Sequence, residues 1–509
     1  MDKDIKKKIK DLASIKTISL VLKKKNKKIV LCHGDFDLLH TGHLNYFLEA
    51  KKNGEILIVS VTSAKFINKG PGRPINDDYQ RIFFLANLEI IDFVILSNDF
   101  NSVNVIKAIK PDYYIKGNDY YLNKKNIYYS KNLELEKKST EKYGGKLLFT
   151  RNQTRSSSSI INNNLLDKDV IDKIKKIKNY YNYEEFLEDI EILKKLKILV
   201  IGETIIDEYI YTSPLGKPSK ENIIATEYFD KKVNLGGIFT AFNTFKAFNN
   251  NVDCITAISN ENKIFFKEKI NKMNNKKLIL NSKFNTTKTR FVQKNSKNLN
   301  KLFEMYNNNY IKISKKNEKI ICKYLKEKLN TYDLVLVNDY GHGFLSNEII
   351  KILIKKSKFL SINTQINAGN NGLNLITKYR DSDFACIDEM EALRAINIPN
   401  LKVNELISNL HKKINSKNIC ITLGSRGSCI QRKGSHPVFC PSLTATVVDT
   451  VGAGDTFFVI SSLFLNIKKS NEIATFLGNV GGAIAVNKEN SDAISSKEVF
   501  MSYVETLLK

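Results

Sequence analysis

The sequence contains no run of about 18 consecutive apolar residues, so we expect no membrane-spanning helix. Its first residues, MDKDIKKKIKDLASIK, include no apolar stretch of signal-peptide length, which predicts a chain that stays in the cytoplasm. The seven cysteines are scattered and form no C-x-x-C pair, which argues against a disulfide framework and against a cysteine zinc site. We therefore expect reduced and mostly buried thiols.

Arginine is scarce as well. It occupies only nine positions, so lysine supplies nearly all of the 80 basic residues behind the formal net charge of +27. Such a charge is typical of nucleic-acid-binding proteins. Abundant lysine, asparagine and isoleucine are also typical of an AT-rich genome, and we favour this second interpretation. We therefore expect no nucleic-acid partner, although a positive field would help to attract nucleotides and phosphosugars.

The 509 residues are enough for two or three domains. Apolar β-rich runs alternate with amphipathic helical stretches along the chain, which predicts α/β domains with parallel sheets and crossover helices. A lysine-rich stretch with few glycines, 167–196, separates two sets of such runs, and we predict a helical connector there. The predicted domains are therefore 1–166 and 197–509.

The segment LCHGDFDLLHTGHLNYFLEAKK begins as a predicted strand, ends as a predicted helix and carries His40 and His43 between them. Two imidazoles three residues apart at a helix start face the same side, where they can donate hydrogen bonds to nucleotide phosphates beside the helix N-terminus. Gly42 leaves room for the nucleotide to approach closely. On this spacing alone, a buried histidine pair without a ligand remains an equal alternative.

The region resembles the cytidylyltransferase-like family, in particular heptose-phosphate adenylyltransferases and glycerol-3-phosphate cytidylyltransferases. Four segments match in family order: GDFDLLHTGH, KGPGRPINDDYQRIFFLANLEIIDFVI, PDYYIKGNDY and RSSSSII. The resemblance implies an N-terminal Rossmann-like nucleotidyltransferase sheet. Class I aminoacyl-tRNA synthetases use a similar histidine motif, but the sequence has no K-M-S-K-S loop. Asp35 departs from the family, which usually has a neutral residue there, and this leaves the choice of substrate open.

The resemblance also implies roles for the matched residues. Asp37 would order the site and its Mg²⁺–nucleotide, while His40 and His43 would stabilise charge on the α- and β-phosphates. A substrate phosphate would attack the α-phosphorus in line and release pyrophosphate, which requires positioning and charge neutralisation more than a protein nucleophile. The donor stays open between ATP and CTP, with ATP favoured by the KGPGRPIN segment. The implied phosphate and nucleotide contacts are Lys69, Arg73, Lys116, Gly117, Asp119, Ser156, Ser157 and Ser158, with Lys69 assisting catalysis.

A second motif, DTVGAGDTFF, occupies 449–458. Gly452, Ala453 and Gly454 form a turn of small residues before an apolar helix, whose N-terminal N–H groups can bind a phosphate as its charge rises during transfer. Asp455 lies at the mouth of that anion hole, where a carboxylate can take the proton from an attacking hydroxyl. For a bare G-A-G-D, an ordinary glycine-rich helix start without a phosphate site would be the better interpretation. The longer D-T-V-G-A-G-D-T-F favours the phosphate site.

This motif resembles the signature of ribokinase-like (PfkB) sugar kinases, and the resemblance extends over about 197–509. It implies a C-terminal ribokinase-like α/β/α sandwich that uses ATP and Mg²⁺. The implied sugar contacts are Asp207, Gly236, Gly237 and Asp339, with Gly343 near the phosphate path. The implied nucleotide contacts are Thr422, Gly424, Gly427 and Asn479, and Glu391 belongs to the Mg²⁺ network.

Three departures from the kinase pattern bear on its substrate. Thr240 stands where many relatives have Asn, and Asp388 replaces the Asn of an N-x-x-E motif in which Glu391 is kept. The segment NTQINAGNNG, 363–372, stands where heptose kinases carry a D-P-K-G loop. These changes predict a sugar other than the usual heptose phosphate, and they leave open a degenerate kinase that only binds its ligand.

The two resemblances together predict a bifunctional enzyme, in the reverse domain order to that usual for heptose enzymes. One site would transfer a nucleotidyl group to a sugar phosphate, and the other would phosphorylate a sugar or sugar phosphate. Such products supply nucleotide sugars for lipopolysaccharide, capsule or other surface glycans. The alternative is an active nucleotidyltransferase joined to a kinase fold that only senses a ligand. Dimers are common in both families, so a homodimer stays open.

Overall fold

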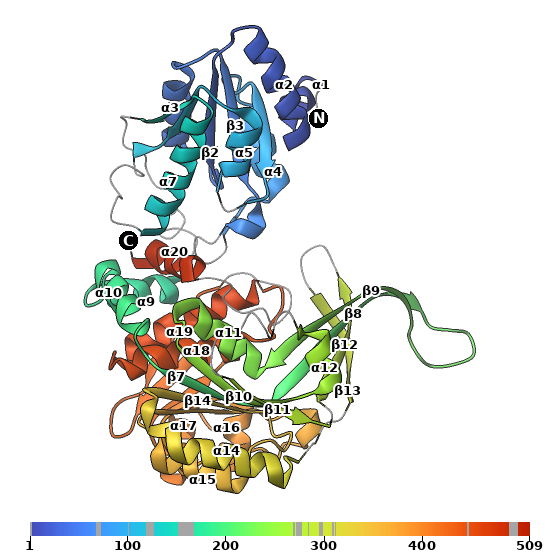
Figure 1. Ribbon diagram of the computed structural model, residues 1–509, viewed down its shortest axis with the longest axis vertical. Coiled ribbons are helices and arrows are strands. Elements are labelled where there is room, and N and C mark those ends of the chain that lie inside the picture. The colour runs from blue at the N-terminus through green and yellow to red at the C-terminus, as the bar shows by residue number, and fades with distance from the viewer. Residues whose placement is uncertain are drawn as a thin grey trace. The chain divides into compact units, whose positions relative to one another are not determined.

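The computed structural model describes residues 3–67, 73–99, 101–118, 127–150, 167–267, 270, 277–283, 285–294, 299–307, 310, 312–444, 447–487 and 497–508. The chain forms two compact units, Met1–Leu166 and Asp167–Lys509 (Figure 1). The stretch expected to be a connector forms helices α9 (Lys168–Lys178) and α10 (Tyr183–Leu193), which belong to the second unit.

The first unit is built on a six-stranded parallel sheet of order β1-β4-β3-β2-β5-β6. The strands are β1 (Ile9–Lys10), β2 (Ile29–Gly34), β3 (Ile56–Thr62), β4 (Phe93–Ser97), β5 (Tyr113–Lys116) and β6 (Lys146–Phe149). The chain runs from β2 through β3 to β4 on one side and then returns to place β5 on the other side of β2. Ligands of open α/β sheets bind at such a switch point, beyond the carboxyl ends of the strands.

Helices cover both faces of this sheet, because its strands are apolar on both sides. Val30 and Cys32 of β2 join a cluster with the helices α3 and α4, whereas Ile29 and Leu31 join a cluster with α2 and α5. The helices of this unit are α1 (Lys3–Lys8), α2 (Leu12–Lys24), α3 (Thr41–Lys51), α4 (Asp78–Ala86), α5 (Val103–Ile109) and α7 (Ile127–Lys142).

The second unit contains a nine-stranded sheet of order β11-β10-β7-β14-β15-β16-β17-β18-β19, parallel except at β18 and β19. Its strands are β7 (Ile198–Gly202), β10 (Val252–Ser259), β11 (Lys277–Ser282), β14 (Leu334–Asp339), β15 (Leu360–Thr364), β16 (Asp381–Asp388), β17 (Asn415–Thr422), β18 (Ser428–Arg432) and β19 (Val438–Cys440). The strand order reverses between β7 and β14, which predicts a ligand site at their carboxyl ends.

Helices lie on both faces of this large sheet, as Figure 1 shows. One layer contains α11 (Ile238–Phe248), α18 (Ala453–Asn466) and α19 (Asn471–Val486), and the other contains α14 (Lys315–Lys328), α15 (Asn347–Lys356), α16 (Glu389–Ile396) and α17 (Val403–Lys413). The helices α12 (Asn260–Phe265) and α20 (Lys497–Leu508) complete the unit. The expected α/β/α layering is therefore present.

A four-stranded sheet of order β13-β12-β8-β9 branches from β7. Its strands are β8 (Thr204–Gly216), β9 (Ala225–Gly237), β12 (Thr286–Lys294) and β13 (Leu299–Asn307). Because β8 follows β7 after a single residue, this small sheet begins at the carboxyl edge of the large one. The parallel pairing of β8 with β12 places Lys288 opposite Asp207.

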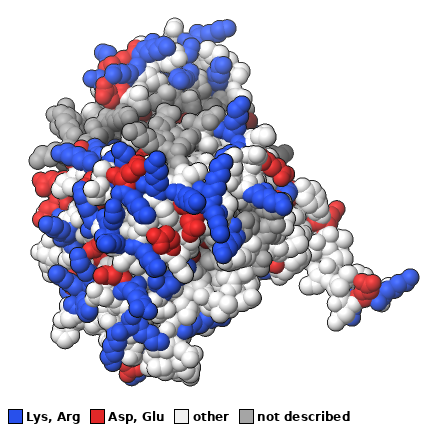
Figure 2. All heavy atoms as spheres, turned by 60° about the horizontal axis from the view of Figure 1, so that its bottom comes forward, with Lys and Arg blue, Asp and Glu red and all other residues white. Residues whose placement is uncertain are grey.

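Two expectations from composition can be compared with the structure. All seven cysteines are buried, as expected, and each of them is free. Lysine and arginine side chains are spread over much of the face shown in Figure 2, with aspartate and glutamate side chains among them. That distribution is what a generally lysine-rich composition produces. Across the described ranges, no helix combines the length and the apolar character that crossing a bilayer requires.

Candidate active sites

The histidine pair of the first unit lies at the start of α3, the helix that follows β2 at the switch point of the sheet. His40 caps helix α3, and its Nδ1 accepts a hydrogen bond from the backbone N–H of Gly42 at 3.0 Å. The ring centroids of His40 and His43 are 4.0 Å apart. Burial lowers the pKa of the His40 imidazole, which favours the neutral ring. With Nδ1 accepting, the proton of that neutral ring lies on Nε2, which can donate to a phosphate oxygen.

Asp37 and Arg73 are brought together as a buried ion pair, with Arg73 Nε 2.5 Å from Asp37 Oδ2. Asp37 Oδ1 also accepts the backbone N–H of Asn76 at 3.0 Å. Asp37 therefore holds the segment that precedes α4. Each of the two carboxylate oxygens of Asp37 accepts a hydrogen bond from the protein, one from Arg73 and the other from Asn76.

Arg81, which sequence reasoning missed, is fully buried on α4. Its NH1 donates to the carbonyl oxygens of Asp35 and Thr62, both at 2.7 Å, and its Nε donates to Asn76 O at 3.1 Å. One guanidinium thus ties together the loop after β2, the end of β3 and the segment before α4. The sequence did contain a signal for this role, because Arg81 falls on the apolar side of an amphipathic helix, where a charged residue needs buried partners.

The remaining predicted residues of the first unit differ in their surroundings. Lys116 ends β5, is buried, and forms an ion pair with Glu136 at 3.2 Å, so the structure gives it a protein partner. Gly117 follows β5 directly, at the ligand-binding edge of the sheet. The predicted residues Lys69, Asp119, Ser156, Ser157 and Ser158 lie outside the described residues.

The second unit has a cleft of about 330 Å³ where the small sheet meets the carboxyl edge of the large sheet. Gly452 adopts a left-handed conformation with φ of +81°, which turns the chain into α18. Asp455, in the first turn of that helix, is buried in the wall of the cleft. Burial raises the pKa of the Asp455 carboxyl to about 6. The predicted residues that line the cleft are Asp207, Gly237, Glu391, Thr422, Gly452, Gly454 and Asp455.

Asp449, the first residue of the same motif, anchors it to the small sheet. Its carboxylate accepts hydrogen bonds from Tyr209 Oη at 3.1 Å and Lys301 Nζ at 2.8 Å, and from Val451 N at 3.2 Å. The turn before α18 is therefore attached to β8 and β13, although about 150 residues separate Lys301 from Asp449 in the chain.

The predicted sugar side is organised around Asp207. Arg290 NH1 donates to Asp207 Oδ1 at 2.6 Å, and Arg290 Nε pairs with Glu304 at 2.8 Å. Gly236 lies behind the carboxylate, where a Cβ would be 1.7 Å from Asp207 Oδ2. Gly237 has φ of +61° and begins α11, and a Cβ there would lie 2.5 Å from the backbone oxygen of Glu203. Both glycines therefore leave room for backbone and carboxylate groups that shape the cleft.

Lys288, a residue that sequence reasoning missed, also lines the cleft. It is only 7% exposed, and burial lowers the pKa of its ammonium group, with Asp207 opposing that shift. Among the described residues, it has no ion pair and no hydrogen bond to an acceptor, and its Nζ lies 5.2 Å from the ring centroid of Tyr306. The alternation T-K-T-R in β12 was the available signal, because it places Lys288 and Arg290 on one face of the strand.

The predicted nucleotide contacts divide between the cleft and its surroundings. Thr422 lines the cleft at the end of β17, whereas Gly424 and Gly427 lie in the turn beyond it, with φ of +59° and +96°. Gly427 is constrained by close packing, because a Cβ would lie 2.1 Å from Cys440 O. Asn479 Nδ2 donates to Ser428 Oγ at 2.7 Å and so joins α19 to β18.

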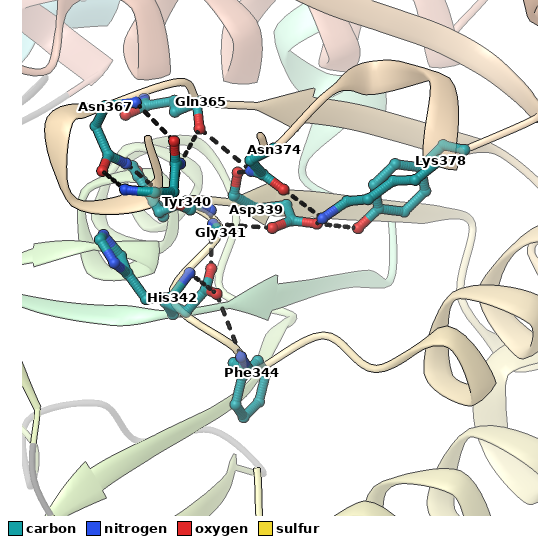
Figure 3. A network of polar contacts seen from close by, with 12 residues as sticks. Asp339, Tyr340, Gly341, His342, Phe344, Gln365, Asn367, Asn374 and Lys378 are labelled. Atoms are coloured by element: carbon teal, nitrogen blue, oxygen red, sulfur yellow. Dashed lines mark hydrogen bonds and ion pairs between the residues drawn. The ribbon is translucent and has the colours of Figure 1, made fainter. Parts of the chain in front are cut away.

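Asp339 does not line the cleft, contrary to its expected sugar contact. Its Oδ2 accepts a hydrogen bond from Tyr379 Oη at 2.6 Å and forms an ion pair with Lys378. Its Oδ1 accepts a hydrogen bond from the backbone N–H of Gly341 at 3.1 Å (Figure 3). With three protein partners, the buried carboxylate fixes the loop after β14. Gly343 continues that loop with φ of +97°.

The same loop is held from the other side by Glu203, which sequence reasoning also missed. Glu203 follows β7, and its carboxylate accepts the backbone N–H groups of Tyr340 at 2.8 Å and His342 at 3.0 Å. Burial and the neighbouring Asp339 raise the pKa of the Glu203 carboxyl above its ordinary value. Glu203 and Asp339 thus position the backbone that carries Tyr340 into the cleft.

Asp388 and Glu391 are the carboxylates that could contact Mg²⁺. Both line the cleft, and they form a capping box at the start of α16. Both Glu391 oxygens already accept backbone N–H groups, from Ile366 and Asp388 at 2.8 Å each. Mg²⁺ usually keeps several waters and takes one or two carboxylates together with substrate phosphates. This pair fits such a site, in which Asp388 would hold the ion and Glu391 would act through a water molecule.

Comparisons with known proteins agree with the division into two units. A family model described as pfkB family carbohydrate kinase matches residues 195–498, and one described as cytidylyltransferase-like matches residues 31–164. The bifunctional protein HldE of Nitratiruptor sp. is 43% identical over 114 residues, which are 22% of this chain and 25% of that protein. HldE of Campylobacter jejuni subsp. doylei is 40% identical over 119 residues, 23% of this chain and 25% of that protein. The chain therefore spans about a quarter of the length of these curated relatives.

Solved structures resemble the chain over its larger part. Phosphofructokinase-2 from Escherichia coli in complex with potassium has a TM-score of 0.50 at 12% identity and covers 61% of this chain and 99% of its own. Ribokinase from Thermotoga maritima has a TM-score of 0.47 at 17% identity, and the match covers 60% of this chain and 98% of the ribokinase chain. At this identity, the likeness to phosphofructokinase-2 shows the fold alone.

Proposed function

The chain belongs to the pfkB family of carbohydrate kinases, whose model matches more than half of it, and we propose that it is a two-site enzyme. In this proposal the second unit phosphorylates a sugar phosphate with ATP. The cytidylyltransferase-like first unit transfers a nucleotidyl group from ATP or CTP to a sugar phosphate and releases pyrophosphate.

One observation carries the kinase assignment: Asp455 lies at the start of α18 in the same cleft as Asp207. Asp207 would accept a hydrogen bond from the sugar and orient it. Asp455 would take the proton from the attacking hydroxyl of the acceptor. At the same time, the oxygen of that hydroxyl forms a bond to the γ-phosphorus of ATP, and the bond between the γ-phosphorus and the leaving ADP oxygen breaks. The N–H groups of the turn before α18 would stabilise the charge on the transferred group.

Lys288 supports a sugar phosphate, in preference to an uncharged sugar, as the acceptor. A buried ammonium group is costly unless it is paired, and no described carboxylate pairs with Lys288. A phosphate group on the acceptor would supply that partner inside the cleft. Bound Mg²⁺ would neutralise charge on the phosphates of ATP, held by Asp388 and, through water, by Glu391.

The close pair of His40 and His43, whose rings are tilted by 32°, supports the nucleotidyltransferase assignment. Their Nε2 atoms would donate to the α- and β-phosphates, while a phosphate oxygen of the acceptor attacks the α-phosphorus and pyrophosphate leaves. The chemistry needs charge stabilisation at those phosphates, which hydrogen bonds from the two imidazoles and the start of α3 can provide.

The two reactions would together supply a nucleotide sugar for surface glycans such as lipopolysaccharide or capsule. We place them in the cytoplasm, and seven free, buried cysteines are consistent with a reducing compartment. The KGPGRPIN segment favours ATP as nucleotidyl donor, with CTP as the alternative.

Two assays on the full-length protein test the proposal. The first measures sugar-phosphate-dependent formation of ADP, with Asp455→Asn as control. The second measures pyrophosphate release from ATP or CTP across a panel of sugar 1-phosphates and polyol phosphates, with His43→Ala as control. Turnover lost in the matching variant would support each site. Pyrophosphate release without any acceptor-dependent ADP formation would favour a kinase fold that only senses its ligand.

A further inference from the structure

The carboxylate of Asp455 is held by three side-chain donors that converge on one of its two oxygens. Asp455 Oδ1 accepts hydrogen bonds from Asn338 Nδ2 at 3.0 Å, Tyr340 Oη at 3.1 Å and Gln365 Nε2 at 3.3 Å. In the part of the chain that the structure describes, no hydrogen bond reaches Oδ2. The two oxygens of the proposed base therefore have different surroundings.

We propose that Asn338, Tyr340 and Gln365 are positioning residues, which hold Asp455 by Oδ1 and leave Oδ2 as the oxygen that receives the proton of the acceptor. The proposal rests on the kinase function proposed above. As the acceptor oxygen bonds to the γ-phosphorus, its O–H bond breaks, an Oδ2–H bond forms, and ADP leaves with the electron pair of the broken P–O bond. A proton on Oδ1 would face two amide N–H donors that cannot accept it.

The donors come from separate segments whose backbones are fixed by further hydrogen bonds. The backbone oxygen of Tyr340 accepts Asn367 Nδ2 at 2.9 Å and Asn370 Nδ2 at 3.0 Å. The backbone oxygen of Gln365 accepts Asn370 Nδ2 at 2.9 Å and Asn374 Nδ2 at 3.2 Å. Figure 3 shows Asn367 and Asn374 close to Tyr340 and Gln365. Rigid support of this kind is what a precisely oriented base requires.

This network gives the unusual asparagine-rich segment a role. The segment 363–372 stands in place of a loop found in heptose kinases, and its amides bind the backbone of the loop after β14. Gln365 N also donates to Asp339 O at 2.8 Å, so the ends of β14 and β15 are joined directly. The substituted loop therefore carries one of the three donors and fixes the backbone of a second.

The side-chain amide of Asn338 uses its N–H groups and leaves its oxygen unpaired, which a network that served only stability would avoid. Its Nδ2 donates to Asp455 and to Tyr340 Oη, while its own Oδ1 is buried without a hydrogen-bond partner among the described atoms. An unpaired buried acceptor is costly, and most buried polar groups in proteins avoid it. The amide is thus oriented in favour of the Asp455 carboxylate.

The hydrogen bonds to Asp455 also affect when it ionises. Burial raises the pKa of its carboxyl, and the Tyr340 hydroxyl opposes this by donating to the ionised form. The other charged and titratable groups that line the cleft come from four elements, namely Asp207 on β8, Lys288 and Arg290 on β12, Cys386 and Asp388 on β16, and Glu391 on α16. Removing the tyrosine hydroxyl leaves these groups in place.

The kinetic test compares Tyr340→Phe with Tyr379→Phe in the full-length protein. Both variants remove a buried tyrosine hydroxyl that donates to an aspartate, but Tyr379 donates to Asp339 outside the cleft. For Tyr340→Phe we expect kcat to fall about tenfold, with little change in KM, and the acidic limb of the kcat profile to move up by about one pH unit. For Tyr379→Phe that limb should not move. Equal profiles for the two variants would overturn the proposal.

A second measurement does not depend on turnover. Tyr340→Phe is introduced into two backgrounds, the natural sequence and the Asp455→Asn variant. For each background, the urea midpoint of unfolding is measured with and without Tyr340→Phe, at about pH 5 and at about pH 7.5. We expect the variant to lower the midpoint more at the higher pH, where Asp455 is ionised, and to show no such pH dependence in Asp455→Asn. A pH-independent loss in both backgrounds would refute the bond to the ionised carboxylate. A complete lack of acceptor-dependent ADP formation would instead refute the proposed kinase function.

Discussion

The carboxylate of Asp207 lies directly against the α-carbon of Gly236, because a Cβ at position 236 would be only 1.7 Å from Asp207 Oδ2. On its other side, Asp207 Oδ1 accepts Arg290 NH1 at 2.6 Å. Residues of β9 and β12 therefore determine together where a carboxylate of β8 enters the cleft.

The first prediction concerns Gly236→Ala. Since the added methyl group must displace the Asp207 carboxylate, we expect KM for the sugar-phosphate acceptor to rise about tenfold or more, with KM for ATP nearly unchanged. Steady-state kinetics of ADP formation would measure both constants. Gly482→Ala in α19 is a control, because its Cβ would meet only Ala453 O at 3.8 Å. An unchanged acceptor KM in Gly236→Ala would contradict the assigned role of Asp207.

The pH dependence of the kinase follows from the burial of Asp455. Its carboxyl has a pKa of about 6, and only the ionised form can accept the proton of the attacking hydroxyl. The rate should therefore be at its plateau above about pH 7 and should fall roughly tenfold for each pH unit well below pH 6. ADP formation measured from about pH 5 to about pH 8 tests this prediction, and a rate that stays flat down to pH 5 would count against Asp455 as the base.

Lys288→Met tests the charge of the acceptor. Because hydrogen bonds to charged groups contribute about 1.5–3 kcal/mol, we expect KM for a phosphorylated acceptor to rise about tenfold or more. An unphosphorylated analogue of the same sugar should be affected much less. Lys231→Met serves as control, since that lysine lies on β9 of the same sheet and pairs with Glu208 at a partly exposed position. Equal effects on the two acceptors would argue against a phosphate bound to Lys288.

Arg81→Met is expected to destabilise the first unit by about 3–5 kcal/mol, because it leaves Asp78 and several backbone oxygens without their buried partner. Pyrophosphate release should then be lost at a lower temperature than in the natural sequence, while ADP formation by the second unit persists. Lys107→Met, an exposed change on α5, should leave both activities intact. Loss of both activities at one temperature would show that the units do not unfold separately.

Several features of the fold and site followed from local sequence signals. Alternating apolar runs and amphipathic stretches predicted the α/β class, which is confirmed, because burial on both faces of a parallel sheet requires such strands. The H-x-G-H and G-A-G-D motifs each lie at a helix start, as expected, since both are contained in one turn of chain. The roles assigned to these residues stay predictions.

Other features were beyond sequence reasoning, because they depend on contacts between distant segments. Arg81 was missed, although it joins three separate segments of the first unit. Asp339 was expected at the sugar, but it contacts Tyr379 and Lys378 about 40 residues further along the chain. Lys116 was expected at the nucleotide, but its ammonium group pairs with Glu136.

The sequence by itself determined the elements, their alternation and the turns that begin α3 and α18, because these depend on propensity, periodicity and glycine conformation within a few residues. Only the tertiary structure decided which side chains share the cleft. The parallel pairing of β8 with β12 brings Lys288 opposite Asp207, and the ends of β14 and β15 bring Tyr340 and Gln365 onto Asp455. Strand order and register are set by the burial of whole faces, so no local stretch of sequence encodes which distant residues will meet.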